Sequence, residues 1–303
     1  MIMEAENDVR AALATIPKLA GFSGEIERLG GLTNRVYRVG EYVLRIPGAG
    51  TAEYINREHE AVSARIAAEA GVAPLVVHAD PGSGVMATRL VADATTMSPD
   101  GFKSRAGSVA RAGDVFRELH TSGGVFPFRF ELFAMIDDYL KVLSSKDVAL
   151  PEGYHAVVRE AEGIRAVLAK HPALLVPCHC DPLCENFLDT GSRMWIVDWE
   201  YSGMNDPMWD LGDLSVEGNF DAAQDDELLQ AYFSALPSAA DHGRMVIYKA
   251  MCDLLWTLWG LIQHANNNPA DDFNAYALNR FKRCKALMAT PDFAAHVRAV
   301  ASL

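Results

Sequence analysis

The run from His179 to Asn186 contains the residue types that phosphoryl transfer requires. It reads His-Cys-Asp-Pro-Leu-Cys-Glu-Asn, and Asp198 follows it at the end of an apolar, strand-like segment. In phosphoryl transfer one carboxylate orients or deprotonates the attacking hydroxyl, while carboxylate and amide oxygens hold Mg²⁺ against the nucleotide phosphates. We therefore predict that Asp181 is the catalytic carboxylate and that Asn186 and Asp198 bind the metal. His179 is expected to position this catalytic loop. The alternative is a loop of ordinary turn residues and helix caps.

A glycine-rich turn and a basic residue upstream could contact the phosphates. Between two strand-like segments lie four residues that could let backbone amides approach a phosphate: Gly30, Gly31, Thr33 and Asn34. A plain hairpin turn explains the same run equally well. Arg45 follows in an apolar strand and could reach the phosphates, and the next helix offers Glu58 or Glu60 as the carboxylate that holds it.

Metal-binding residue types crowd the catalytic loop and raise the alternative of a zinc-containing interaction module. They are Cys178, His179, Cys180 and Cys184. The spacing Cys-x-Cys-x3-Cys is not that of a usual zinc site, and no second Cys/His pair follows nearby. We therefore expect no zinc. The odd total of five cysteines favours free thiols.

Composition limits the classes of function. The chain has 303 residues, of which 50% are hydrophobic and 22% charged, as in a folded globular protein. Lys and Arg number 27 against 40 Asp and Glu, which gives a net charge of −13. That sign disfavours nucleic acid and anionic membranes as partners but suits a small cationic ligand. The sequence has no uninterrupted apolar run of about 18 residues and no signal-peptide pattern, so we expect a cytoplasmic location.

Hydrophobic periodicity predicts two parts of different type. In the first 90 residues strands alternate with helix: we expect helices over 5–18 and 53–71, three strands over 26–46, and two strands flanking the turn at 79–84. Beyond residue 100 we expect helices over 105–122, 131–143, 154–171 and from 222 onward, interrupted by a strand-rich segment at 174–200.

The predicted fold class is therefore α+β, with a strand-rich domain over 1–90 and a mostly helical domain over 91–303. Within the helical part, His120 is expected to make a structural contact at a helix end. Asp210 and Asp213 are expected to act as a helix N-cap and a loop anchor.

Several motifs together resemble the choline/ethanolamine kinases, a branch of the protein-kinase-like group that includes aminoglycoside phosphotransferases. The motifs are GGLTN, VLRIPG, INREHE, HCDPLCENFL and IVDWEYSGMNDPMWDLG, and the resemblance extends over residues 25–285. It implies a bilobal kinase-like fold with ATP between a small β-rich lobe and a larger helical lobe, and Mg²⁺ as cofactor. It also implies that Asp181 is catalytic and that Asn186 and Asp198 bind the metal.

The resemblance assigns further residues to the nucleotide. Arg45 matches the basic residue over the phosphates, and Glu60 matches its helix partner, with Glu58 as the competing register. Three residues of the connector between the lobes would meet adenine, the first beside the ring and the other two through backbone groups: Met86, Ala87 and Arg89.

A second group of residues matches the ammonium site of the choline kinases. It consists of Tyr201, Glu217, Trp256, Trp259 and Tyr276. A quaternary ammonium prefers aromatic faces, and a helical spacing of three places the two tryptophans on one face. The alternative is a buried aromatic stripe without ligand.

The expected reaction is transfer of the ATP γ-phosphate to the hydroxyl of choline or ethanolamine, and the partner is this small cationic alcohol. Thiamine and aminoglycosides are alternative substrates, although an aminoglycoside site would use many carboxylates and few tryptophans. A catalytically silent protein that binds nucleotide and ammonium is the alternative of another class. The oligomeric state and the preference for ATP or GTP stay open.

Overall fold

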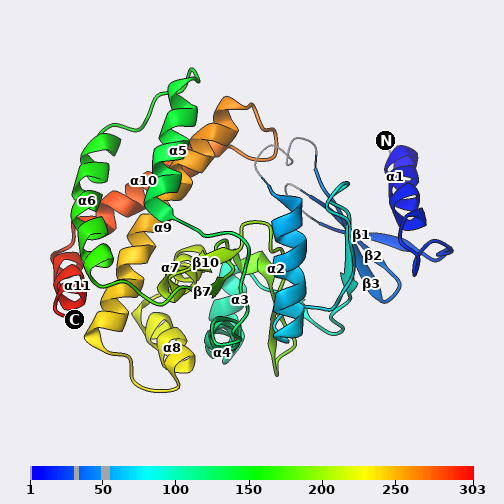
Figure 1. The fold of residues 1–303 in the computed structure, drawn as a ribbon, viewed down its shortest axis with the longest axis horizontal. Helices are drawn as coiled ribbons and strands as arrows, with labels where there is room; N and C mark the ends of the chain where they lie inside the picture. The colour runs from blue at the N-terminus through cyan, green and yellow to red at the C-terminus, as the bar shows by residue number, and fades with distance from the viewer. Residues whose placement is uncertain (1, 31–33, 49–54) are drawn as a thin grey trace.

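The computed structural model describes residues 2–30, 34–48 and 55–303. Its N-terminal part is built on a five-stranded antiparallel sheet (Figure 1). The strands are β1 (Ile26–Gly30), β2 (Arg35–Val39), β3 (Tyr42–Ile46), β4 (Val76–Ala79) and β5 (Met86–Arg89). Their spatial order is β1-β2-β3-β5-β4. The strands therefore lie where the sequence predicted them, on both sides of the turn at 79–84.

A helix covers each face of this sheet (Figure 1). α1 (Ile2–Ala14) buries Val9 in a small core with Leu44 of β3. α2 (Arg57–Glu69) lies on the opposite face. Because side chains alternate along a strand, Leu44 points toward α1 whereas the next residue, Arg45, points toward α2. The alternation therefore places the guanidinium of Arg45 between the two parts of the molecule.

The start of α2 is fixed by a cap. The side chain of Asn56 accepts hydrogen bonds of 3.1 Å from the backbone amides of Glu58 and His59. This is the usual way in which the first amides of a helix are satisfied. The helix therefore begins at Arg57, later than the position 53 that the sequence predicted.

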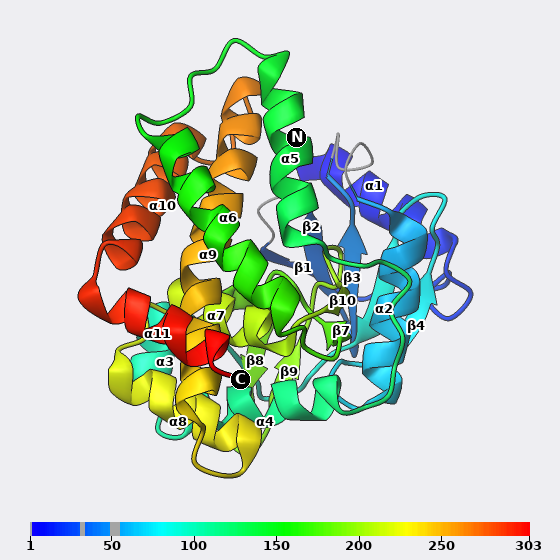
Figure 2. The same cartoon turned by 60° about the vertical axis from the view of Figure 1, so that its left-hand side comes forward.

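The C-terminal part is mostly helical. Its helices are α3 (Pro99–Ser104), α4 (Ser108–His120), α5 (Leu132–Ser144), α6 (Tyr154–Lys170), α7 (Pro207–Glu217), α8 (Ala222–Phe233), α9 (Ala239–Ala265), α10 (Phe273–Met288) and α11 (Pro291–Ala301). α5, α7, α10 and α11 all pack against α9, which runs through the middle of this part (Figure 2). The predicted α+β class is confirmed, with a small antiparallel sheet followed by a mostly helical region.

α9 is the most apolar long helix of the described residues. By length and composition alone it could cross a membrane, but 78% of its most apolar window is buried inside the fold. Its hydrophobic surface is therefore already covered by the neighbouring helices.

Short strands of the C-terminal part flank the loops that face the five-stranded N-terminal sheet. β7 (Val176–Cys178) pairs with β10 (Gly203–Asn205), while β8 (Phe187–Asp189) pairs with β6 (Thr95–Thr96) and β9 (Met194–Ile196). The turn of 3₁₀ helix η2 (Cys184–Asn186) precedes β8. The strand-rich segment predicted at 174–200 is confirmed, and it places the catalytic loop between β7 and β8.

α7 was missing from the predicted elements. Its N-cap is Asp206, whose side chain accepts the backbone amide of Met208 at 3.0 Å, and Pro207 occupies the first helical position. The expectation that Asp210 or Asp213 caps a helix is therefore wrong, because both lie inside α7. The signal that identifies this start is Asp-Pro, since proline is preorganised for the first turn.

Candidate active site

A cavity of about 870 Å³ lies between the sheet and the helical part. Most of the residues that the sequence singled out line it: Gly30, Asn34, Arg45, Glu60, Met86, Arg89, Asp181, Asn186, Asp198, Tyr201, Glu217, Trp256, Trp259 and Tyr276. Gly31 and Thr33 lie outside the described residues. The remaining two, His179 and Ala87, are buried away from the cavity, for reasons given below.

The catalytic loop is held by α7. The buried carboxylate of Asp210 accepts the backbone amides of His179 at 2.7 Å and Cys180 at 2.8 Å. His120 lies 3.1 Å from the same carboxylate through Nε2, so its predicted structural role at a helix end is confirmed. Trp209 donates from Nε1 to the carbonyl of Cys180 at 3.1 Å. Asp210 is thus the loop anchor, and the loop can present Asp181 to the cavity in one fixed position.

His179 supports the site from behind. Its ring is fully buried, 4.9 Å from that of Trp199, and Nε2 lies 3.0 Å from the carbonyl of Val197. Burial lowers the pKa of His179, so the ring is neutral and its Nε2–H donates to that carbonyl. This bond ties the catalytic loop to the residue before Asp198. His179 is therefore placed to position the loop, and it does not line the cavity.

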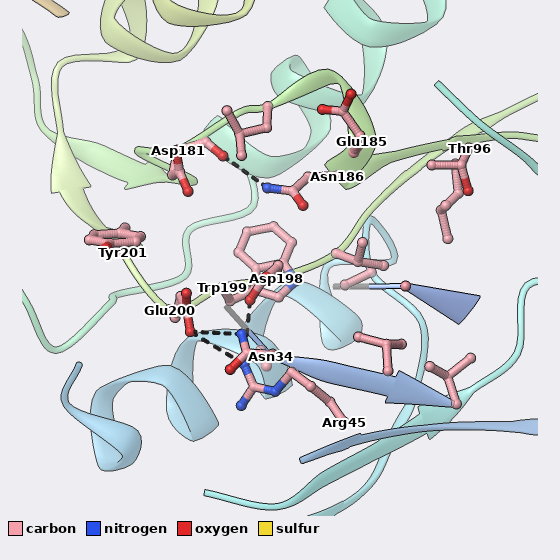
Figure 3. A pocket seen from close by; sticks show the side chains of 18 of the residues that line it. Asn34, Arg45, Thr96, Asp181, Glu185, Asn186, Asp198, Trp199, Glu200 and Tyr201 are labelled. Carbon is pink, nitrogen blue, oxygen red and sulfur yellow. Dashed lines mark hydrogen bonds and ion pairs between the residues drawn. The ribbon is translucent and has the colours of Figure 1, made fainter. Parts of the chain in front are cut away.

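Asn186 and Asp198 approach the cavity from opposite sides, as Figure 3 shows. Asn186 donates through Nδ2 to the carbonyl of Asp181 at 3.0 Å, which leaves its Oδ1 available as an acceptor. Asp198 has a left-handed backbone with φ of +69°, a conformation that aspartate tolerates better than most residues. Such conformations are typical of functional sites, where the surrounding structure maintains them.

The oxygen donors here fit a divalent cation. Carboxylate oxygens of Glu60, Asp198 and Glu200 lie within 4.8 Å of one another. Burial raises the pKa of Asp198, although Arg45 opposes the shift, and burial together with Asp198 raises the pKa of Glu200 to about 7. A cluster of oxygens that carries excess negative charge suits a hard cation such as Mg²⁺. Glu200 was not among the predicted metal ligands, although it follows Asp198 by two residues.

Arg45 is held by Glu60 and not by Glu58. Its guanidinium pairs with Glu60 and lies 3.4 Å from Asp198 Oδ1. Glu58 is exposed in the first turn of α2. The structure adds Arg57, which pairs with Glu60 at 2.8 Å and with Glu200 at 3.0 Å. The two arginines and their carboxylates therefore form one buried charge network below the metal-ligand candidates.

The end of the cavity beside β5, where the sequence predicted the nucleotide base, is largely apolar. Met86 and Thr88 of β5 line it, and Leu90 and Val91 continue the lining after the strand ends. Ala87 points to the opposite face, where it is buried in the core beneath α1. Its backbone lies between β3 and β4, paired with Leu44 and His78. The predicted contact of Ala87 with adenine is therefore wrong, because both edges of a central strand are paired with neighbouring strands.

Arg89 lines the cavity at its edge only. Its guanidinium lies 2.7 Å from Glu41 and 5.5 Å from the ring centre of Tyr42, and its side chain is half exposed. The backbone amide of Arg89 donates to Leu75 at 2.8 Å, and that of Leu90 donates to Glu41 at 2.9 Å. Backbone groups beyond Leu90 are therefore better candidates for contact with a base.

Aromatic rings gather at the other end of the cavity. Trp256 lies 5.8 Å from Tyr201 and 6.3 Å from Trp259 between ring centres, and Trp259 lies 5.8 Å from Tyr276. All these pairs meet edge to face. Phe273, 5.4 Å from Trp259, also lines the cavity and was missed by the sequence analysis. Its position three residues before Tyr276, on the same helical face, is the signal that could have identified it. These five residues are called the aromatic cluster below.

Carboxylates surround Asp181. Burial raises the pKa of Asp181 well above its ordinary range, and the negative charges of Asp213 and Glu217 raise it further. A carboxylate with a raised pKa is a stronger proton acceptor. Glu217, at the end of α7, is paired with Arg280 of α10, a residue that the sequence analysis had not selected.

The chain is similar to known proteins in both sequence and fold. Residues 25–248 match the model of the phosphotransferase enzyme family. The fold superimposes on a choline/ethanolamine kinase family protein of Mesorhizobium loti with a TM-score of 0.93 and 68% identity, covering 98% of this chain and 99% of that one.

Two further comparisons extend the similarity to other bacteria. The chain is 29% identical over 267 residues to the protein LicA of Haemophilus influenzae, covering 83% of this chain and 76% of that protein. The choline kinase LicA of Streptococcus pneumoniae has the same fold, with a TM-score of 0.79 at 24% identity, covering 94% of this chain and 99% of that one.

Proposed function

This chain belongs to the phosphotransferase enzyme family and, within it, to the choline/ethanolamine kinases, and on that premise we propose that it transfers the γ-phosphate of ATP to the hydroxyl of choline. The aromatic cluster carries this proposal. Tyr201, Trp256, Trp259, Phe273 and Tyr276 line the same cavity as Asp181. Aromatic faces attract a quaternary ammonium, which has no N–H to donate.

In the proposed reaction Asp181 orients the choline hydroxyl and accepts its proton as the oxygen attacks the γ-phosphorus. Its raised pKa, caused by burial and neighbouring carboxylates, suits this acceptance. The bond between the γ-phosphorus and the bridging oxygen of ADP breaks as the ester bond forms. Positioning and neutralisation of charge supply most of the rate in such transfers.

The chain's own residues hold the nucleotide in this proposal. Asn186 and Asp198, with Glu200 close by, would hold Mg²⁺, which neutralises phosphate charge when bound. Arg45, fixed by its ion pair with Glu60, would lie over the phosphates. The base would occupy the apolar end lined by Met86 and Thr88. ATP and Mg²⁺ are therefore the proposed cofactors.

Ethanolamine is the second candidate substrate, because Glu217 adds a carboxylate to the same cavity wall as the rings, where N–H groups could compete with Arg280 for it. A coupled assay of ADP release tests both candidates together with thiamine and an aminoglycoside. We expect choline to give the highest kcat/KM. A higher value for thiamine or the aminoglycoside would overturn the substrate class, and the absence of alcohol-dependent ADP release would favour the silent binding protein.

A further inference from the structure

A cation of the protein itself, the guanidinium of Arg280, lies against the aromatic cluster. Arg280 of α10 is 3% exposed and pairs with Glu217 through Nη2. Its Nη1 lies 3.2 Å from Asp253 Oδ1, and its Cζ lies 4.8 Å from the ring centre of Tyr276. One guanidinium therefore engages the carboxylate of Glu217 and one face of the Tyr276 ring, two groups that a substrate ammonium would also seek.

Of the other carboxylates near the aromatic cluster, Asp213 does not line the cavity, and its buried Oδ1 has no hydrogen-bond partner within the described residues. Asp213 Oδ2 accepts the indole N–H of Trp256 at 3.2 Å. Burial raises the pKa of Asp213 well above its ordinary range, and Glu217 adds to the shift, so Asp213 holds its proton more tightly than an exposed carboxyl. Asp271 lines the rim but is exposed, where water competes for its oxygens. Among the described residues that line this end of the cavity, a bound ammonium thus meets aromatic faces and few charged acceptors besides Glu217 and Asp181.

We propose that Arg280 makes the site selective for a fully substituted ammonium over a primary ammonium, by occupying the carboxylate of Glu217. This inference rests on the proposed function and deepens it. A primary ammonium brings three N–H donors, and each one that leaves water without an acceptor costs free energy. A fully substituted ammonium has no such donors and is stabilised by the rings alone. A site that leaves buried N–H donors unpaired discriminates strongly against the substrate that carries them.

The charge of Arg280 does not by itself distinguish the two substrates. It repels a primary and a quaternary ammonium to a similar extent, since both carry one positive charge. Its effect on the ratio of the two kcat/KM values therefore comes from the acceptor that it occupies.

Arg280→Met tests the inference through that ratio. We expect the choline-to-ethanolamine ratio of kcat/KM to fall about tenfold, because the freed Glu217 can accept the N–H groups of ethanolamine through charge-assisted hydrogen bonds. Arg283→Met is the matched control. Arg283 also pairs with Asp253, at 2.6 Å, but its side chain is 38% exposed and does not line the cavity. Its ratio should stay within about twofold of wild type.

The double variant Glu217→Gln, Arg280→Met completes a double-mutant cycle. Without a charged acceptor the ratio should return to within about threefold of wild type. Glu217→Gln alone should also leave the ratio nearly unchanged, because Arg280 already engages this carboxylate. This single variant keeps the inference testable if Arg280→Met does not fold, which thermal melting reports.

Three results would overturn the inference: an unchanged ratio in folded Arg280→Met, an equal fall in Arg283→Met, or a tenfold loss of ethanolamine turnover alone in Glu217→Gln. Failure of the proposed function is distinguishable from these, since it appears as no turnover of either alcohol by the wild-type chain. Calorimetric binding of choline and ethanolamine then measures the ratio of the two affinities independently of turnover.

Discussion

The carboxylate of Asp210 accepts a 2.7 Å hydrogen bond from the backbone amide of His179, two residues before Asp181. Asp210 lies on α7 and is fully buried, so its hydrogen bond fixes the catalytic loop relative to that helix. The same helix ends at Glu217 in the cavity. α7 therefore connects the placement of Asp181 with the placement of the residues around a bound ammonium.

Asp210→Ala should weaken both stability and turnover. The substitution leaves the buried amides of His179 and Cys180 without their acceptor. We expect this to lower the free energy of unfolding by about 3 kcal/mol or more. Urea unfolding and kcat measure the two effects. Asp221→Ala is the control: it removes the N-cap of α8, should cost about 1 kcal/mol, and should leave kcat unchanged. Equal effects of both variants on kcat would contradict the anchoring role.

Asp181→Asn should preserve the fold and nucleotide binding while lowering kcat by about 10²–10⁴-fold. The amide keeps the shape of the side chain but accepts no proton from the hydroxyl. Steady-state kinetics, nucleotide binding by calorimetry and thermal melting separate these properties. Glu185→Gln is the control, since Glu185 is an exposed carboxylate that lines the same cavity four residues later. Turnover of Asp181→Asn within a few-fold of wild type removes Asp181 from the catalytic role.

As the pH is lowered, kcat/KM should fall at a higher pH than it would if an ordinary carboxyl group were being protonated. Burial, followed by the charges of Asp213 and Glu217, raises the pKa of Asp181. Protonated Asp181 cannot accept the hydroxyl proton, so kcat/KM is lost as the pH falls through this raised value, above the ordinary carboxyl pKa of about 3.9.

Glu217→Gln tests whether the acid limb of the pH profile, which is the loss of kcat/KM at low pH, comes from protonation of Asp181. Removing a negative charge near Asp181 makes its ionised form less unfavourable, so the acid limb of kcat/KM should move to lower pH. The pH profile of the variant measures the direction directly. A limb that stays in place, or moves to higher pH, contradicts the assignment of this limb to Asp181.

Trp259→Ala should raise the KM for choline roughly tenfold while leaving the KM for ATP nearly unchanged. The expected loss is about 1–2 kcal/mol from the missing cation–π contact. Because Trp259 also packs against Trp256 and Phe273, thermal melting must accompany the kinetics. Trp195→Ala is the control, since it removes a tryptophan of β9 whose ring lies beneath Arg193. Unchanged choline kinetics in a folded Trp259→Ala protein would mean that the ammonium binds elsewhere.

Much of this site could be predicted because its residues lie in short, distinctive motifs. Asp181, Asn186 and Asp198 are close in sequence, and the hairpin of β8 and β9 between the last two brings them to one cavity. The pairing of Arg45 with Glu60 instead of Glu58 depends on where α2 begins. The cap at Asn56 sets that start, and the sequence analysis did not recognise it.

The errors have a common physical cause, which is that orientation depends on tertiary contacts. Ala87 was expected at adenine, but the parity of β5 turns Met86 and Thr88 toward the cavity and Ala87 toward α1. The sequence analysis assigned no role to Arg280, and its own helix does not reveal its burial, because an arginine on an amphipathic helix usually faces solvent. Here it is buried by ion pairs with carboxylates of α7 and α9, which are distant in sequence. The division into domains 1–90 and 91–303 stays a prediction.

The proposed reaction is tested most directly by ³¹P NMR of the protein with ATP, Mg²⁺ and choline. The expected result is a new phosphate-monoester signal that grows in equal amount with ADP, requires choline and Mg²⁺, and is lost in Asp181→Asn. ADP that accumulates with inorganic phosphate alone, at a rate independent of choline, would contradict the proposed transfer to choline.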